Sequence, residues 1–113
     1  MQVIHERCAG LDIHKKLVVV TVLITHANGQ VQKFTRTFAT MLAELLALAD
    51  WLDSLQVVQI AMESTGVFWH PVYHVLEDGR TLLLVNPQHI KALPGRKTDV
   101  KDSEWIADLF RHG

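Results

Sequence analysis

The order of the predicted elements places this chain in the mixed α/β class: three antiparallel strands, then two parallel strands, flanked by helices. Three strand-like segments come first, the second of them strongly β-branched and apolar, and the polar links between them suit hairpins. Strand-like and helical segments then alternate, an order that requires parallel pairing through right-handed crossovers. The length of 113 residues and the apolar content of 49% suffice for a buried core. We therefore expect one domain over residues 1–113.

The first strand is predicted in a modest apolar run over 3–13, and the second in the strongly β-branched, continuously apolar segment 17–24. A third strand is predicted near 31–38. The polar link His14-Lys15-Lys16 fits a tight hairpin, and Asn28-Gly29 is a turn signal before the third strand. Asp12 lies where the first of these strands ends. From that position its carboxylate can reach a surface cleft while neighbouring strands hold its backbone.

A helix is predicted from Met41 to about Leu55, because apolar residues recur there at intervals of three and four. Thr40 precedes it and can cap it. The acidic residues Glu44, Asp50 and Asp53 are left for solvent. We expect the apolar positions to form the face toward the core: Met41, Leu42, Leu45, Leu46, Leu48, Ala49, Leu52 and Leu55.

The remaining elements are predicted as a strand at 57–62, a helix at 66–77, a strand at 81–85 and a helix at 99–112. Glu63 follows directly on the first of these strands, and Ser64 or Thr65 can start the helix after it. Pro71 is tolerated only near the first turn of that helix, and Gly79 is a stop signal.

Two carboxylates, Asp99 and Asp102, lie one helical turn apart where the Pro94-Gly95 turn gives way to the last helix. They continue the stripe of Ile106 and Leu109, so they are expected to face inward. Neighbouring buried carboxylates cost free energy unless a proton, a cation or a basic group neutralises them. The alternative is that Asp99 caps the helix and Asp102 interacts favourably with the helix dipole.

If the strands that end at Asp12 and Glu63 are parallel neighbours, both acids fall on the same edge of the sheet. The last helix can then bring two more acids to this edge. The predicted cluster consists of Asp12, Glu63, Asp99 and Asp102. Hard oxygen ligands suit Mg²⁺ or Mn²⁺, and a pair of such ions, about 3.5–4 Å apart, can stabilise both oxygens of a phosphodiester displacement.

The composition limits the partners and the compartment. A net charge of -1 and a pI of about 6.6 lack the basic footprint of a self-sufficient nucleic-acid binder. Positive charge is nevertheless concentrated near the last acids, where Arg96, Lys97 and Lys101 can hold phosphates. One cysteine, Cys8, permits no internal disulfide, and no apolar run approaches a membrane span or signal peptide. We expect a cytoplasmic protein without membrane contacts.

Four motifs occur in this order: Gly10-Leu11-Asp12, Glu63-Ser64-Thr65-Gly66, Asn86-Pro87 and Lys97-Thr98-Asp99-Val100-Lys101-Asp102. Together they resemble the N-terminal domain of DEDD-type transposases of bacterial insertion sequences, over nearly the whole chain. The resemblance implies a ribonuclease-H-like, RuvC-type fold, with Asp12, Glu63, Asp99 and Asp102 as the four acids of the family. It also implies Mg²⁺-dependent DNA recombination guided by a structured bridge RNA.

Full-length members of this family also carry a C-terminal domain with a serine implicated in strand exchange, and we expect this domain to be absent from a chain that stops at Gly113. The leading hypothesis is a metal-dependent DNA-cleaving or strand-transferring domain that forms homo-oligomers. The alternative is a module for dimerisation and for DNA or guide-RNA docking that does not cut by itself. A third is an ATP-binding domain of the actin and sugar-kinase type, although the Gly-rich phosphate loops it would need are not found.

His70 and His74, at i and i+4, are weaker candidates for a zinc pair, since no cysteine lies nearby.

Overall fold

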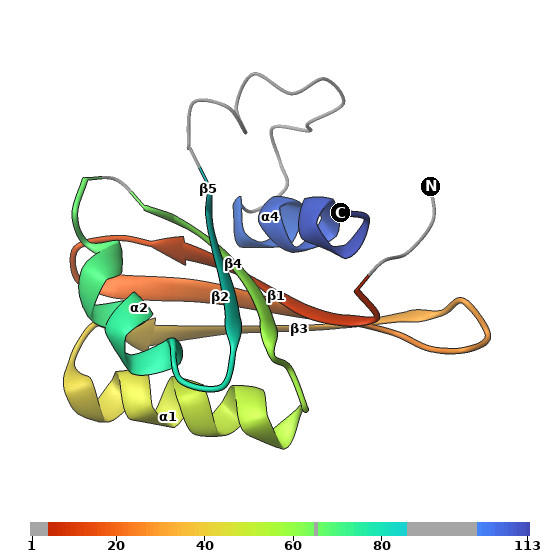
Figure 1. The fold of residues 1–113 in the computed structure, drawn as a ribbon, viewed down its shortest axis with the longest axis horizontal. Helices are drawn as coiled ribbons and strands as arrows, with labels where there is room; N and C mark the ends of the chain where they lie inside the picture. The colour runs from red at the N-terminus through yellow and green to blue at the C-terminus, as the bar shows by residue number, and fades with distance from the viewer. Residues whose placement is uncertain (1–4, 65, 86–101) are drawn as a thin grey trace.

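The computed structural model describes residues 5–64, 66–85 and 102–113, which form a five-stranded sheet between helices (Figure 1). The elements follow in this order: β1 (Arg7–Ile13), β2 (Leu17–Thr25), β3 (Val31–Ala39), α1 (Leu42–Ser54), β4 (Gln59–Ser64), α2 (Trp69–Leu76), β5 (Thr81–Val85) and α4 (Asp102–Arg111). Within the described residues, no helix has the length and hydrophobicity that a bilayer-crossing segment needs.

The strand order across the sheet is β3-β2-β1-β4-β5. β1 pairs antiparallel with β2, and β2 with β3, because their links are hairpins. β4 pairs parallel with β1 and with β5, because helical crossovers connect these strands. The predicted mixed sheet, three antiparallel strands followed by two parallel ones, is thereby confirmed.

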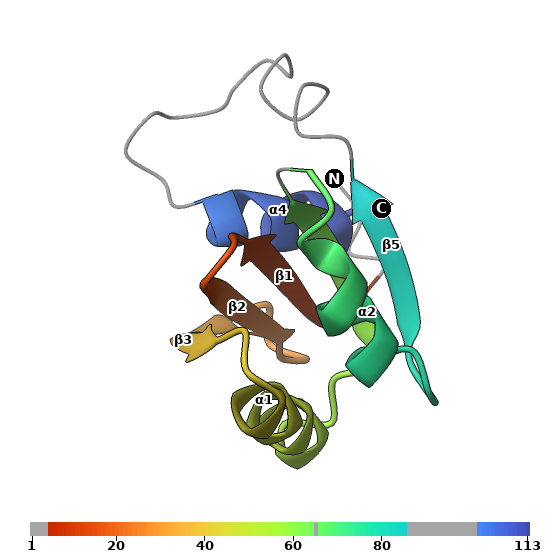
Figure 2. The same cartoon turned by 90° about the vertical axis from the view of Figure 1, so that its left-hand side faces the viewer.

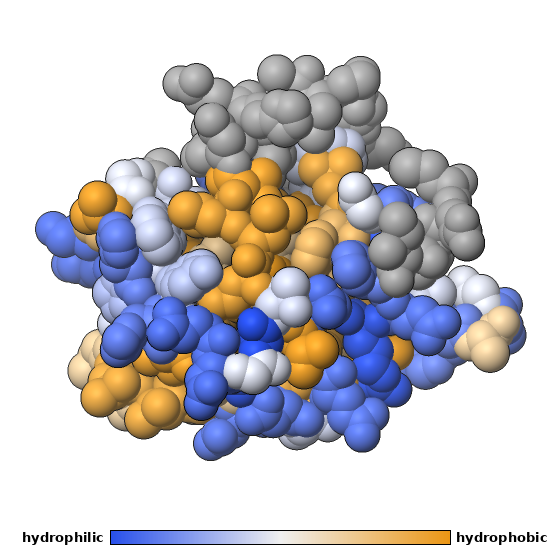
Figure 3. Space-filling view, in the orientation of Figure 1, coloured by the Kyte–Doolittle hydropathy of each residue, from blue (hydrophilic) through white to orange (hydrophobic). Residues whose placement is uncertain are grey.

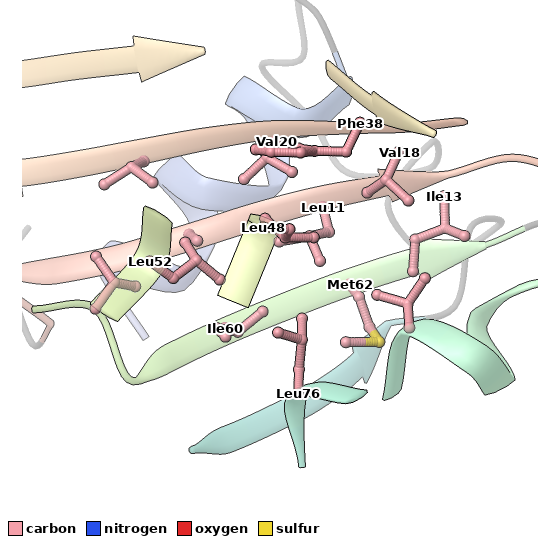
Figure 4. Packing of buried hydrophobic residues seen from close by; sticks show 14 of the residues in the cluster. Leu11, Ile13, Val18, Val20, Phe38, Leu48, Leu52, Ile60, Met62 and Leu76 are labelled. Carbon is pink, nitrogen blue, oxygen red and sulfur yellow. The ribbon is translucent and has the colours of Figure 1, made fainter. Parts of the chain in front are cut away.

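One face of the sheet carries the main apolar core, against α1 and α2. Alternate residues of the strands point to this face, so every second side chain is buried here. Figure 4 shows Leu11 of β1 and Ile60 of β4 close to Leu48 of α1 and Leu76 of α2, and all four are fully buried. Burial of one such side chain stabilises the fold by roughly 1.5–3 kcal/mol.

The opposite face is covered by α4 (Figure 2). Small residues on this face allow the backbone of α4 to approach the sheet closely, and Gly10 of β1 is the extreme case. A Cβ atom on Gly10 would lie only 2.4 Å from both the backbone nitrogen of Ala107 and the carbonyl oxygen of Ser103. Glycine is therefore required at this position by the helix above it, since the backbone of α4 occupies the space of a side chain.

The structure corrects two details of the first predicted helix. Thr40 does not cap it: the Thr40 hydroxyl donates to the carbonyl of Lys15 at 2.8 Å, and Met41 occupies the N-cap position without a side-chain cap. Met41, Leu42 and Leu46 were expected in the core but are 68%, 65% and 50% exposed. The reason is that the stripe of α1 that packs on the sheet is narrower than the apolar face predicted from the periodicity. Its buried residues are Leu45, Leu48 and Leu52.

The strand and helix around residue 64 also differ from the prediction. β4 continues through Glu63 to Ser64, so Ser64 ends a strand and does not start a helix. Gly66 has a φ of 63°, a left-handed conformation that a right-handed helix cannot contain. The α2 helix therefore starts at Trp69, which places Pro71 in its first turn. Of the helix predicted over 99–112, residues 99–101 lie outside the described residues.

Exposed hydrophobic side chains gather over α1 and β5 (Figure 3). Leu83 and Leu84 of β5 are 49% and 42% exposed. They lie on a strand at the end of the sheet order, which has only one neighbouring strand.

The Cys8 thiol lies beneath α4 and offers a test of how firmly this helix is docked. Its Sγ donates to the carbonyl of Ala107 at 3.5 Å, and burial raises the pKa of this thiol to about 12. Because the folded-state pKa exceeds the ordinary 9.0, burial of the neutral thiol stabilises the fold below about pH 9. This contribution is lost as the pH rises from about 9 to about 12.

We expect Cys8 of the native protein to react with an aromatic disulfide reagent at about pH 8 only through opening of α4, since only exposed thiolates attack disulfides. The measurement is the rate of thiol modification with and without denaturant. Equal rates in the native and the denatured protein would contradict the docking of α4 over β1.

Candidate metal centre

Asp12 and Glu63 lie side by side on the two central strands. The parallel register of β1 and β4 pairs Asp12 with Glu63, one residue before each strand ends. The neighbouring pairs in this register, Leu11 with Met62 and Ile13 with Ser64, keep both backbones fixed. The prediction that these two acids share one edge of the sheet is confirmed.

Asp102, in the first turn of α4, adds a third carboxylate. One carboxylate oxygen from each of Asp12, Glu63 and Asp102 lies within 4.8 Å of the others. Glu63 is buried at 6% exposure, whereas Asp12 and Asp102 are partly buried. Three residues from elements far apart in the sequence thus place oxygen ligands around one point at the rim of the sheet.

Polar contacts between α4 and the sheet fix the position of Asp102. The hydroxyl of Ser103, the next residue along α4, lies 2.9 Å from that of Thr21 on β2, and both residues are fully buried. Thr21 in turn lies 3.2 Å from the Thr35 hydroxyl of β3. Lys33 of β3 forms an ion pair with Glu104 at 3.2 Å. Since a buried hydroxyl without a partner costs about 1–3 kcal/mol, the Ser103–Thr21 pair favours one register of the helix on the sheet.

Sequence reasoning missed the role of Thr21. The signal was present, because Thr21 is the one hydroxyl in the otherwise apolar segment 17–24. A threonine is also a favourable strand residue, however, so its partner on a helix 82 positions away could not be inferred.

His14 contacts the cluster from the β1–β2 turn. Its Nε2 lies 3.0 Å from the Oδ2 of Asp12, and the imidazole is half exposed. This contact holds one oxygen of the Asp12 carboxylate. A carboxylate oriented by an imidazole is better fixed for binding a cation than a freely rotating one.

The donor set of the cluster fits a divalent ion with a preference for oxygen. Two unit charges 4 Å apart repel by about 1 kcal/mol in water and by about 4 kcal/mol at the effective dielectric of a protein surface. Three clustered carboxylates therefore favour occupation by a cation, and Mg²⁺ or Mn²⁺ accepts such ligands together with water. In the described part of the chain, this is the group of residues with the spacing of a metal site.

The other predicted site residues are Asp99, Arg96, Lys97 and Lys101, and they lie outside the described residues. Their roles as a fourth acid and as phosphate-binding groups stay predictions. His70 and His74, the candidate zinc pair, are both exposed on α2, and the ring of His70 stacks on Trp69 with centroids 3.8 Å apart. They are not part of the acidic cluster.

Among solved structures, the chain is similar to the RuvC protein of Thermus thermophilus. One such structure, RuvC in complex with a Holliday junction substrate, has a TM-score of 0.59 and 13% identity, covering 91% of this chain and 90% of that chain. A second Thermus thermophilus RuvC structure gives 0.60 and 12% identity, covering 89% and 90%. At this identity the likeness shows the fold, which is RuvC-like as the motifs implied.

A comparison with curated proteins returned no similar sequence. A family model described as "Transposase", that of the DEDD transposases of the IS110 type, matches residues 9–113. The match contains the three clustered acids and nearly the whole chain. The chain therefore belongs to the IS110-type DEDD transposase family.

Proposed function

We propose that this domain cleaves or transfers DNA strands with the help of Mg²⁺ or Mn²⁺ held by Asp12, Glu63 and Asp102. The observation that supports the proposal most is the convergence of three carboxylate oxygens within 4.8 Å at the ends of two adjacent parallel strands. Asp99, three residues before Asp102 in the sequence, is the proposed fourth ligand. A divalent ion bound here would polarise the scissile phosphate and stabilise the attacking and leaving oxygens.

The residues of the chain have separate tasks in this proposal. Glu63 is the least exposed of the three acids, so its side chain is the most confined of the three proposed ligands. Asp12 is oriented by His14, and Asp102 moves only with α4.

The partners follow from the family and from the charge distribution. DNA is the proposed substrate, with its phosphates held in part by Arg96, Lys97 and Lys101. A structured guide RNA, a homo-oligomeric assembly and a cytoplasmic location are further parts of the proposal. They rest on the motifs and the composition described above.

A second candidate is a domain that docks nucleic acid and dimerises without cutting. The net charge of -1 favours it, because a protein that acts on DNA alone usually carries an excess of positive charge. The two candidates differ in whether metal is needed. Cutting requires the ion, whereas docking through lysines and arginines does not.

Metal linkage tests the proposal. Mg²⁺ that binds only the native state at ten times its dissociation constant stabilises the fold by about 1.4 kcal/mol. For a domain of this size, this corresponds to a rise in melting temperature of roughly 4–8 °C. Thermal melting with increasing Mg²⁺ or Mn²⁺, beside cleavage of branched DNA with the same ions, provides the measurement. A melting temperature indifferent to millimolar metal, together with metal-independent DNA binding, would favour the docking module.

A further inference from the structure

The turn between β1 and β2 lies directly beside the acidic cluster, and its backbone is firmly held. It consists of His14, Lys15 and Lys16. The backbone N–H of His14 donates to the carbonyl of Leu17 at 2.8 Å. From the end of β3, the hydroxyl of Thr40 donates to the carbonyl of Lys15 at 2.8 Å, and the N–H of Thr40 donates to that of Lys16 at 3.1 Å. The turn is thus tied to two strands, while its three side chains remain exposed.

The two lysines of this turn differ from the other basic residues that the structure describes. Lys33 pairs with Glu104, Arg80 with Asp53 and Arg111 with Asp108, at 3.2, 2.7 and 3.2 Å. The remaining two arginines are also engaged: Arg7 donates to the carbonyl of Leu55, and Arg36 lies over Phe38 and Trp51. Lys15 and Lys16, by contrast, have no carboxylate within ion-pair distance among residues 5–64, 66–85 and 102–113.

These lysines are close enough to the cluster for both to contact phosphates of the same strand. Lys15 is three residues after Asp12, so their Cα atoms are at most about 11 Å apart, and the contact of His14 with Asp12 keeps the turn close. Phosphates follow one another at about 3.4 Å per nucleotide along the axis of a duplex. A strand with one phosphate at the acids can therefore offer a neighbouring phosphate, one to three nucleotides away, to the turn.

We propose that Lys15 and Lys16 bind phosphates of the DNA strand that flank the phosphate held at the acidic cluster. The inference deepens the proposed function and rests on it. Three carboxylates repel a DNA backbone that approaches them, and two positive charges on the turn beside the cluster offset this repulsion. Since the backbone of the turn is already ordered by Thr40, binding orders only the two side chains, which lowers its entropic cost.

The test is the double variant Lys15→Gln/Lys16→Gln against a control with the same change in charge. The control is Ala27→Glu/Gln30→Glu, which also makes the chain more negative by two charges. Both control positions are exposed and lie in the hairpin between β2 and β3, at the opposite end of β2 (Figure 1). Affinity for fluorescently labelled branched DNA is measured by anisotropy over a series of salt concentrations.

We expect the lysine variant to bind DNA about ten-fold more weakly or worse at low salt. Its slope of log affinity against log salt should fall in magnitude by about one to two, because each neutralised phosphate contributes roughly 0.7–0.9. The control should keep the slope of the parent. An unchanged slope in the lysine variant, an equal loss in the control, or a loss confined to structured RNA would overturn the proposal.

Metal binding separates a failure of this inference from a failure of the proposed function. The lysine variant should keep the full rise in melting temperature with Mn²⁺, because neither lysine is a ligand. If the parent chain shows no metal linkage while the lysine variant still loses DNA affinity, the turn binds DNA and the metal-dependent function is wrong. If metal linkage is present and DNA affinity is unchanged in the lysine variant, the metal site stands and the role of the turn is wrong.

Discussion

Asp12→Asn is expected to remove most of the stabilisation by Mg²⁺ or Mn²⁺ and to slow metal-dependent DNA cleavage by more than about a hundred-fold. The amide keeps the shape of the side chain but supplies a neutral ligand in place of a charged one. A hundred-fold is the upper end of what the loss of an outer-shell partner of a metal costs, and the loss of a charged ligand should exceed it. The measurements are melting curves with and without metal and the cleavage rate of branched DNA.

The same variant should behave in the opposite way without metal. Removing one of three carboxylates within 4.8 Å relieves their repulsion, so metal-free Asp12→Asn should be as stable as the parent or more stable by about 1 kcal/mol. Asp50→Asn is the matched control, since Asp50 is exposed on α1, which packs on the face of the sheet opposite α4. A metal-induced shift in Asp12→Asn as large as that of the parent would show that the three acids do not share an ion.

The sequence predicted the topology because two independent patterns agreed. Short polar links such as 14–16 permit only antiparallel neighbours, and intervening helices impose parallel ones. This topology alone placed the strands of Asp12 and Glu63 next to each other, and the observed register pairs the two residues directly. Half of the predicted cluster thus followed from chain order and strand ends, without any knowledge of side-chain contacts.

Periodicity could not predict how much of a helix is covered. Leu42 and Leu46 widen the apolar face beside Leu45 in the sequence pattern, yet they are exposed. Burial depends on where the helix lies on the sheet, which is set by the strands beneath it and by its connections. Thr40 shows the same limitation, because its hydroxyl donates to the carbonyl of Lys15 in the β1–β2 turn, 25 residues away in the sequence.

The sequence predicted that Asp102 faces the sheet, but not which contacts bring the helix into that position. The inward stripe through Ile106 indicated that this acid faces the sheet, and the structure brings it to Asp12 and Glu63. The helix can lie there because Gly10 has no side chain, and the buried contact between Ser103 and Thr21 keeps it in that position. Neither is visible in hydrophobic periodicity, since both depend on a close approach of two backbones.

Gly10→Ala is accordingly expected to destabilise the fold by about 3 kcal/mol or more, the upper range for an overpacked core. Its new methyl group would meet the backbone nitrogen of Ala107 and the carbonyl oxygen of Ser103 at 2.4 Å, and backbone atoms cannot turn aside as a flexible side chain can. The helix must move away from β1, which takes Asp102 from the other two acids. Chemical denaturation measures the stability, and a Mn²⁺ titration of the folded fraction measures the loss of metal affinity.

The thiol of Cys8 and a second substitution distinguish helix displacement from a general loss of stability. Because Cys8 is covered by α4, its modification in Gly10→Ala should accelerate under conditions where the sheet remains folded by circular dichroism. Shortening the side chain above it, in Gly10→Ala/Ala107→Gly, should not restore stability, since the obstructing atoms belong to the backbone. Full recovery in this double variant would mean that only side chains collide, and Gly10 would then not be what sets the distance between α4 and the acidic cluster.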